Sequence, residues 1–356
     1  MTNSTGNWLE FLQQQGARIA SVPLSGAVEV LDFGVPSVPP APVSNFVAPL
    51  TDLGLIALTG EEATHFLHNQ LTNDVEHLGP SEARLAGYCS PKGRLMATFL
   101  MWKTADVILL QLPRELQAAL QKRLQMFVLR AKVKLADVMA EHVMLGLAGA
   151  RAAAVLPQWF PAMPLAPYQK AESEAGTLIR LANAIGSPRF QWITTPSVAQ
   201  DAWPILTRDV NPAATAAWRL SDIHAAIPQI RLATQEQFVP QMINYEVVGG
   251  VNFKKGCYPG QEIVARSQYL GKLKRRMMPA SVLSATAKPG TEVFSASDAG
   301  QPCGMIVNAE LNALEEMACL VELKVAAMET GPVHLGAPDG PVLRFEPLPY
   351  ELLDPT

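Results

Sequence analysis

The chain has 356 residues, 49% of them hydrophobic, and a formal net charge of -4. This length and apolar content provide for two or three packed domains and exclude global disorder. The mild acidity excludes a general nucleic-acid coat, which needs a basic excess. No apolar run reaches the ~20 residues that span a bilayer, and Met1 to Gln15 shows no signal-peptide pattern. We therefore expect a cytoplasmic chain without a membrane partner.

The N-terminal residues 1–48 form a leader rich in proline. A short helix is expected from Asn7 to Leu12. The run from Val35 to Val43 follows, and its proline density requires an extended, helix-free connector. We expect the leader either to drape over the body or to stay partly mobile.

The body begins with short apolar segments in the order strand, helix, hairpin, strand, helix, strand, strand. Thr59 and Glu62 have the spacing of a capping box for the first helix, which should end near Asn73. The second helix should begin at Pro113 and bury one apolar face, made of Leu116, Ala119, Leu120, Leu124 and Phe127. The remaining expected elements are a strand over 55–60, a hairpin of 83–89 and 94–102 with a turn at 90–93, and strands over 107–112, 132–135 and 143–148. This order predicts an α+β fold with a mixed or antiparallel sheet.

The residue pattern of the sequence changes at Pro279. From there, short β-prone runs alternate with Pro-Gly and Gly-Pro breaks. This pattern predicts a small antiparallel barrel or sandwich at the C-terminus.

The four cysteines are widely scattered, and Cys257 lies in the most informative segment, 254–266. Gly256 and Pro259-Gly260 bracket a tight loop, and a helix should follow over Gln261 to Gln268, with Ile263 and Val264 facing inward. A cysteine just before a helix and near two lysines favours a thiolate over the free-thiol pKa of ~8.5. The alternative is a small buried hydrophobic residue. Cys89, Cys303 and Cys319 are expected to be free thiols.

Seven basic residues and one acid lie between Lys254 and Arg276. They form either a solvated basic face or a landing site for carboxylates or phosphates, such as a polyglutamyl tail or an RNA backbone. No RNA-binding signature with interleaved aromatics accompanies them, so direct tRNA binding is not expected. His65 and His68 could face one another at i, i+3, but no third ligand is evident, and we predict no resident metal site.

The octapeptide at 255–262, Lys-Gly-Cys-Tyr-Pro-Gly-Gln-Glu, resembles the signature of the YgfZ family, relatives of the T-protein of the glycine cleavage system. Further stretches resemble other landmarks of that family in the right order. They are 60–75 for its first helix, 88–94 for its first hairpin turn, 238–245 for the run into the signature, and 346–350 for its C-terminal end. The resemblance covers residues ~50–350.

The resemblance implies an α+β, T-protein-like ring of several domains around a central folate site, with a C-terminal antiparallel β-barrel. We expect a folate-binding region over 49–245 with two subdomains, the signature loop and helix over 246–276, and the barrel over 277–356. The implied function is support of iron–sulfur enzymes, including those that thiolate tRNA. The implied partners are these enzymes and a reduced folate, namely tetrahydrofolate or a derivative. Cys257 would be the key thiol and a transient iron ligand in a cluster shared with a partner, because one thiolate cannot hold a stable cluster.

The resemblance also assigns folate-site residues. Trp218 matches a tryptophan that lines the site and could stack on a pterin or aminobenzoyl ring; the alternative is an ordinary core tryptophan. Leu53 stands where the family has a second tryptophan, and His224 stands where many relatives have a glutamate that hydrogen-bonds the pterin. An imidazole cannot reproduce the paired acceptors of a carboxylate. The other expected site residues are Tyr245, Lys254, Lys255, Glu262 and Arg266.

The alternative function is one-carbon transfer by an aminomethyltransferase. Such enzymes resemble this chain in fold but carry an acidic pair on the strand after the hairpin turn, which orients the folate amine. The equivalent stretch, Gly93 to Phe99, contains no acid. We therefore expect a folate-binding factor rather than a transferase, and a monomer.

Overall fold

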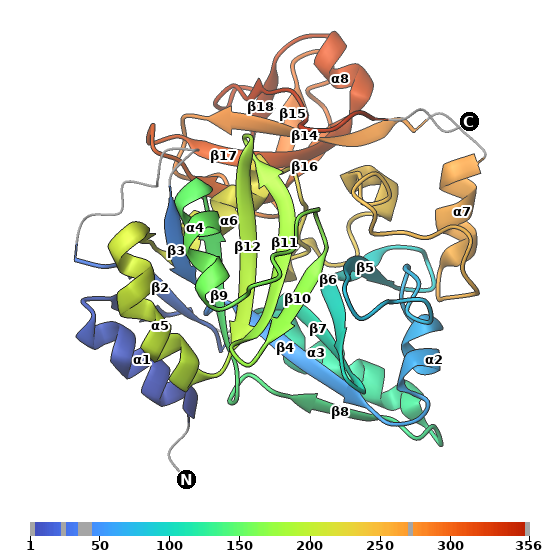
Figure 1. The fold of residues 1–356 in the computed structure, drawn as a ribbon. Helices are drawn as coiled ribbons and strands as arrows, with labels where there is room; N and C mark the ends of the chain where they lie inside the picture. Colours follow the sequence, from blue (N-terminus) through green and yellow to red (C-terminus); the bar gives the residue numbers. More distant parts are fainter. Residues whose placement is uncertain (1–3, 23–25, 35–44, 270–272, 353–356) are drawn as a thin grey trace. The chain divides into compact units, whose positions relative to one another are not determined.

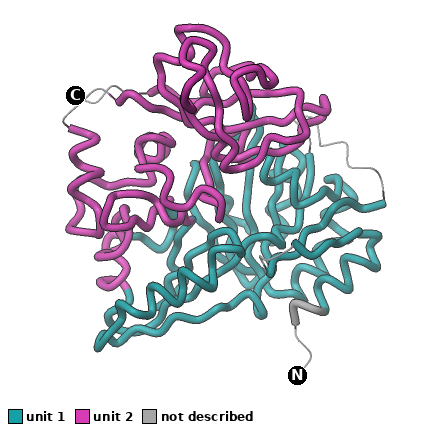
Figure 2. The backbone as a smooth tube through the Cα atoms, turned by 180° about the vertical axis from the view of Figure 1, so that it is seen from behind, with its two compact units in different colours: residues 1–63, 78–84, 100–221 teal, residues 64–77, 85–99, 222–356 magenta. Residues whose placement is uncertain are grey.

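The computed structural model describes residues 4–22, 26–34, 45–269 and 273–352. The chain divides into two compact units (Figure 2): unit 1 comprises residues 1–63, 78–84 and 100–221, and unit 2 comprises 64–77, 85–99 and 222–356. Both units are therefore built from segments that are distant in sequence. The proline run at 35–43 lies outside the described residues.

The first sheet of unit 1 has six strands in the order β10-β11-β12-β9-β3-β13. The pairings are antiparallel, apart from the short parallel pair of β13 with β3. The bounds are β3 Phe46–Pro49, β9 Val143–Ala148, β10 Lys170–Ser173, β11 Gly176–Ala184, β12 Ser187–Thr194 and β13 Asn211–Pro212. Every residue of β9 is buried, which shows that both faces of this strand are covered. The continuous apolar run at 143–148 is typical of such a strand.

A second group of strands in unit 1 consists of β7 Val107–Pro113, β4 Leu53–Thr59 and β8 Lys134–Asp137, paired in that order. Residues 100–104 of β6 Leu95–Thr104 pair with β7. Helix α3 Arg114–Val128 follows β7 directly and buries Leu116, Leu120 and Leu124. The predicted apolar face of this helix is thus correct in part. Ala119 and Phe127 were wrongly assigned to it, because both are exposed.

Helix α1 Ser4–Gln14 confirms and extends the predicted N-terminal helix. Trp8 and Leu12 are buried in the core of unit 1, and the Trp8 ring meets the Trp203 ring edge-on at 5.8 Å. Trp203 belongs to α5 Pro196–Asp209, which lies beside α1 in Figure 1. Of the two predicted states of the leader, packing against the body is observed for this helix. The antiparallel pair β1 Arg18–Ser21 and β2 Val28–Asp32 was not predicted.

Strands β5 Ala83–Cys89 and β6 form the predicted hairpin around Ser90 to Arg94, and residues 85–99 of it belong to unit 2. The turn is closed by hydrogen bonds from Ser90 N to Arg94 O, 2.8 Å, and from Gly93 N to Ser90 O, 2.9 Å. The predicted capping box of the preceding helix is wrong: Thr59 ends β4, and α2 Ala63–His68 begins four residues later. Glu62 instead accepts a hydrogen bond from Lys132 N, 2.6 Å, within unit 1.

The C-terminal part of unit 2 is an antiparallel sheet in the order β18-β15-β16-β17-β14-β19, drawn in orange to red in Figure 1. This curled sheet confirms the predicted antiparallel β architecture of the C-terminus. Its bounds are β14 Arg275–Val282, β15 Glu292–Ser295, β16 Gly304–Leu311, β17 Met317–Lys324, β18 Val333–Leu335 and β19 Arg344–Phe345. Its core buries Val293, Ile306, Cys319 and Val321. No helix among the described residues is long and apolar enough to cross a membrane.

The packing of α1 generates a stability prediction for Trp8→Ala. Removing this buried indole should lower the free energy of unfolding by about 3–5 kcal/mol, because a large cavity replaces its contacts with Trp203. The matched control is Glu10→Ala on the same helix, where the side chain is exposed and the effect should stay within about 0.5 kcal/mol. Urea unfolding followed by circular dichroism measures both. Equal midpoints for the two variants would show that α1 contributes nothing to the core.

Candidate functional site

Cys257 is the exposed member of the four cysteines; Cys89, Cys303 and Cys319 are buried. It lies in a segment without helix or strand that we call the thiol loop, residues 249–260, which ends where α7 Gln261–Tyr269 begins. Burial raises the pKa of Cys89 and of Cys319 to about 12. Burial also raises the pKa of Cys303. The alternative of a buried hydrophobic residue is thus wrong for Cys257, and Cys89, Cys303 and Cys319 are free thiols as expected.

The start of the thiol loop is fixed by the polar residues Thr72 and Asn73, which follow α2. Thr72 Oγ1 donates to Gly250 O, 2.6 Å, and Thr72 O accepts from Asn252 N, 2.9 Å. The amide of Asn73 donates to Gly249 O and to Leu85 O, both at 2.7 Å. These bonds satisfy backbone groups that no secondary structure pairs, and they tie the loop to strand β5.

Lys255 ties the middle of the loop to the end of α2. Its Nζ donates to His68 O at 2.5 Å, to Leu71 O at 3.0 Å and to Gly256 O at 3.2 Å. The same ammonium lies 4.9 Å from the centre of the Tyr258 ring. Burial lowers the pKa of Lys255 to about 8, against the opposing attraction of Asp74, Cys257 and Glu76.

The end of the loop packs against the hairpin turn at 90–93. Gly260 has φ +79°, and a Cβ placed on it would collide with Ser90 O and the backbone of Gly93. Gly93 has φ +68°, and a Cβ there would lie 2.8 Å from Cβ of Ile263. Both positions therefore require glycine for conformation and for space. Ile263 is 39% exposed despite this contact, whereas Val264 is fully buried, so the predicted inward orientation is correct for Val264 and wrong for Ile263.

A group of histidines and carboxylates surrounds the end of α2 in unit 2. His68 Nδ1 lies 3.2 Å from Asp74 Oδ1 and accepts from Val75 N at 3.4 Å. His65 Nδ1 lies 3.2 Å from Glu76 Oε1. Within the described ranges, no three His, Cys, Asp or Glu side chains gather closely enough to hold a metal ion.

The basic run from Lys254 to Arg276 does not form one continuous face. Arg275 is paired with the buried Glu322, and Arg276 is buried with Glu246, each at 2.5 Å. These two arginines lie in strand β14 and hold it in the fold, so neither proposed use of the whole run holds for them. Lys254 and Arg266 are exposed. Lys272 lies outside the described residues.

The expected folate-site residues fall in both units. In unit 1, Trp218 on α6 Thr215–His224 is 3% exposed, and the Arg189 guanidinium lies 4.9 Å from its ring. A Cβ on Gly146 would collide with the same ring, so glycine in β9 makes room for the indole. His224, at the end of α6, belongs to unit 2 and is half-buried.

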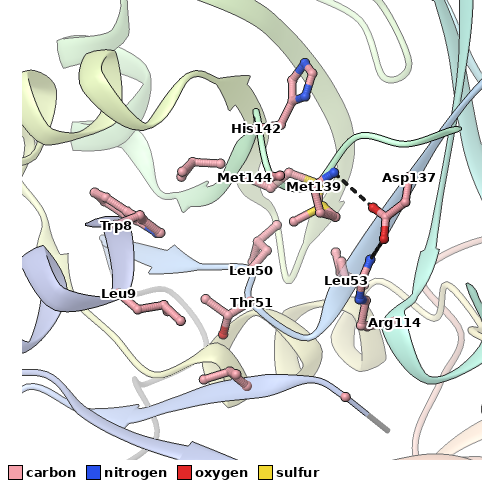
Figure 3. Close-up of a pocket in the computed structure, with 14 residues that line it drawn as sticks. Trp8, Leu9, Leu50, Thr51, Leu53, Arg114, Asp137, Met139, His142 and Met144 are labelled. Atoms are coloured by element: carbon pink, nitrogen blue, oxygen red, sulfur yellow. Dashed lines mark hydrogen bonds and ion pairs between the residues drawn. The ribbon is translucent and has the colours of Figure 1, made fainter. Parts of the chain in front are cut away.

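Leu53 is one of the residues that line a cavity of about 330 Å³ within unit 1 (Figure 3). Its apolar wall consists of Trp8, Leu9, Leu50, Val143, Met139 and Met144. Arg114 and Asp137 form an ion pair of 2.7 Å at one side, and Asp137 also accepts from Met139 N at 3.0 Å. The position at which the resemblance implies a tryptophan thus faces a cavity large enough for a small ring system.

The comparisons with known proteins agree with this arrangement. The chain is 28% identical over 325 residues to the tRNA-modifying protein YgfZ of Shigella sonnei, an alignment that covers 89% of this chain and 98% of that protein. The YgfZ protein of Escherichia coli O7:K1 matches with the same identity and coverage. The predicted resemblance is confirmed. No protein-family model matches the chain.

A solved structure supports the fold of this YgfZ-like chain. The glycine cleavage system aminomethyltransferase T of Bartonella henselae superposes with a TM-score of 0.77 and covers 96% of both chains. The sequences are 17% identical, so this match shows the fold alone. It confirms the predicted α+β, T-protein-like fold class.

Unit 2 brings together Lys255 and Cys257 in one loop, places Glu262 and Arg266 one turn apart on α7, and buries Tyr245. The Tyr245 hydroxyl donates to Ala86 O, 2.9 Å, which holds the run before the loop against β5. The anchoring roles of Thr72 and Asn73 were not foreseen. The signal that could have indicated these roles was the presence of two polar side chains directly after an apolar helix.

The burial of three thiols predicts selective alkylation. Iodoacetamide at pH 8 should add one group to the folded protein, at Cys257, because the thiols with a pKa of about 12 stay protonated and shielded. Intact-mass and peptide analysis measure the number and place of the adducts. Denatured protein should take four, and folded Cys257→Ala should take none. Labelling of Cys89 at the rate of Cys257 would contradict the assignment.

Proposed function

We propose that this chain is a folate-binding factor that supports the assembly or repair of iron–sulfur enzymes, including tRNA-modifying ones, with Cys257 as its key thiol. The observation that carries the proposal is the exposed cysteine in a loop whose backbone is fixed on both sides. The curated relatives that match the chain are named tRNA-modifying proteins, which favours clients in that process.

A single thiolate supplies too few ligands for a stable cluster. Cys257 therefore acts on a transient species. Either it binds one iron of a cluster shared with a partner protein or a small thiol, or its thiolate attacks the outer sulfur of a partner's persulfide, whose S–S bond breaks and releases the partner's thiolate. Its exposure suits both routes, because the second component has to reach the sulfur atom.

The folate part of the proposal rests on the T-protein-like fold and on Trp218. We assign Trp218, in unit 1, to folate binding as an aromatic wall. Tyr245, Lys254, Lys255, Glu262 and Arg266, all in unit 2, are the further residues that the resemblance assigns to the ligand. Leu53 and His224 depart from the family pattern, which weakens stacking and pterin recognition. The proposed ligand is tetrahydrofolate or a derivative.

One-carbon transfer is disfavoured by the chemistry of strand β6. This strand reads Leu-Met-Ala-Thr-Phe-Leu-Met-Trp-Lys-Thr and has no carboxylate. Thr98, in the middle of it, accepts a hydrogen bond from Ile230 N at 3.0 Å. A hydroxyl engaged in this way cannot replace a carboxylate that orients the folate amine.

Cys257→Ala tests the thiol. In cells that lack the endogenous protein, wild type should restore thiolated tRNA nucleosides, and the variant should leave them at the level of cells without any copy. Mass spectrometry of digested tRNA measures the nucleosides. The matched control is Cys303→Ala, which removes a buried thiol and should restore modification like wild type. Full restoration by Cys257→Ala would overturn the role of this thiol.

Trp218→Ala tests the folate site. Calorimetric titration with tetrahydrofolate and its 5-formyl derivative should show binding that the variant weakens by about 1–3 kcal/mol, the range for ring stacking on an aromatic side chain. The control is Trp203→Ala, which removes another buried indole of unit 1 and should leave the affinity unchanged. Equal affinities for wild type and Trp218→Ala would return Trp218 to a purely structural role.

A further inference from the structure

The ammonium of Lys255 meets three carbonyl oxygens, and an ammonium group has three N–H donors. Two acceptors, His68 O and Leu71 O, come from the end of α2 and the turn that follows it. The third, Gly256 O, belongs to the thiol loop itself. The carbonyls at the C-terminal end of a helix have no partner inside the helix, so they are natural acceptors for a cation.

The contacts of Lys255 fall on both sides of Cys257 in sequence. Gly256, directly before the cysteine, accepts a hydrogen bond, and the ring of Tyr258, directly after it, faces the ammonium at 4.9 Å. Tyr258 is itself 7% exposed, so its ring is fixed by packing. One cation therefore restrains the backbone of the three residues 256–258 relative to α2.

The charges around this cation favour its position. Burial acts against the charged form of Lys255 and lowers its pKa, and Asp74, Cys257 and Glu76 oppose this by attracting the ammonium. A Cβ placed on Gly256 would lie 3.5 Å from His68 Nε2, at ordinary van der Waals distance, so this part of the loop lies beside the end of α2.

We propose that Lys255 is the positioning residue of Cys257: it locks the thiol loop onto the C-terminal end of α2 and holds the sulfur in one place on the surface. This rests on the proposed function of Cys257 and adds a role for a residue that the resemblance places with folate. The neighbouring Lys254 is exposed, and its backbone N donates to Asn252 Oδ1. Its side chain therefore does not share the anchoring role of Lys255.

The experiment compares Lys255→Met, Lys255→Arg and the matched control Lys254→Met in full-length protein. The amides of Gln261 and Val264 donate to Tyr258 O and Gly260 O of the thiol loop, each at 3.2 Å. Hydrogen–deuterium exchange followed by mass spectrometry should show exchange of these amides about tenfold or more faster in Lys255→Met, because the loop that carries their acceptors is no longer held by the charged donor. Lys255→Arg should recover most of the protection, since a guanidinium also presents several donors and keeps the charge. Lys254→Met should exchange like wild type.

A second readout separates positioning from general stability. The melting temperatures of all three variants should match wild type, while restoration of thiolated tRNA should be lost in Lys255→Met and recovered in Lys255→Arg. A lowered melting temperature in Lys255→Met without any local change in exchange would show a core role and overturn positioning.

The failure of this inference can be told apart from failure of the proposed function. If Cys257→Ala abolishes restoration but Lys255→Met restores like wild type with unchanged exchange, the thiol stands and the positioning role is overturned. If Cys257→Ala restores modification, the proposed function itself fails, whatever the exchange shows, and no thiol remains for Lys255 to position.

Discussion

Unit 2 depends on one constraint: a stretch of about a dozen residues without helix or strand has to find partners for its backbone groups. Thr72 and Asn73 supply them for the first part of the stretch, through bonds of 2.6 to 2.9 Å to residues 249–252. Lys255 supplies one for the middle, at Gly256 O, and the end of the stretch packs closely on the hairpin turn at Gly260 and Gly93. Each anchor comes from a part of unit 2 far away in sequence. Cys257 remains exposed because its own side chain takes part in none of these anchors.

Glycine and small polar residues allow close backbone contacts and hydrogen bonds at this site that larger side chains would prevent. Gly260 and Gly93 allow two backbones to meet, and Thr72 uses one hydroxyl both to donate to Gly250 O and to accept from Gly87 N at 2.7 Å. Such an arrangement restrains the loop without a hydrophobic core of its own. It is the kind of support that a reactive side chain needs if it is to meet a partner in a defined orientation.

Unit 1 differs from unit 2 in that its core buries several large aromatic rings. Trp8, Trp192 and Trp203 share one core, and Trp218 occupies a space that Gly146 leaves open. The cavity beside Leu53 borders the same region and is closed on one side by residues of α1. The N-terminal helix is thus part of the wall of a cavity as well as of the core, which gives the first residues of the chain a role beyond that of a linker.

The sequence by itself determined the elements whose signals are local. The apolar runs of β4, β7 and β9, the turn at Ser90 to Gly93 and the change of residue pattern before the C-terminal sheet all follow from period and turn chemistry. The signature around Cys257 and the family resemblance were also readable, since they depend on short ordered motifs. Tertiary structure decided what depends on distant partners. The capping box at Thr59 was not formed because Glu62 bonds Lys132 instead, and Phe127 is exposed because α3 buries a face centred on Leu120. Only the fold could show that Arg275 and Arg276 pair with the buried carboxylates of Glu322 and Glu246, and that Lys255 bonds the end of α2, 187 residues earlier in the chain. Side-chain partners separated by so many residues leave no pattern in a single sequence.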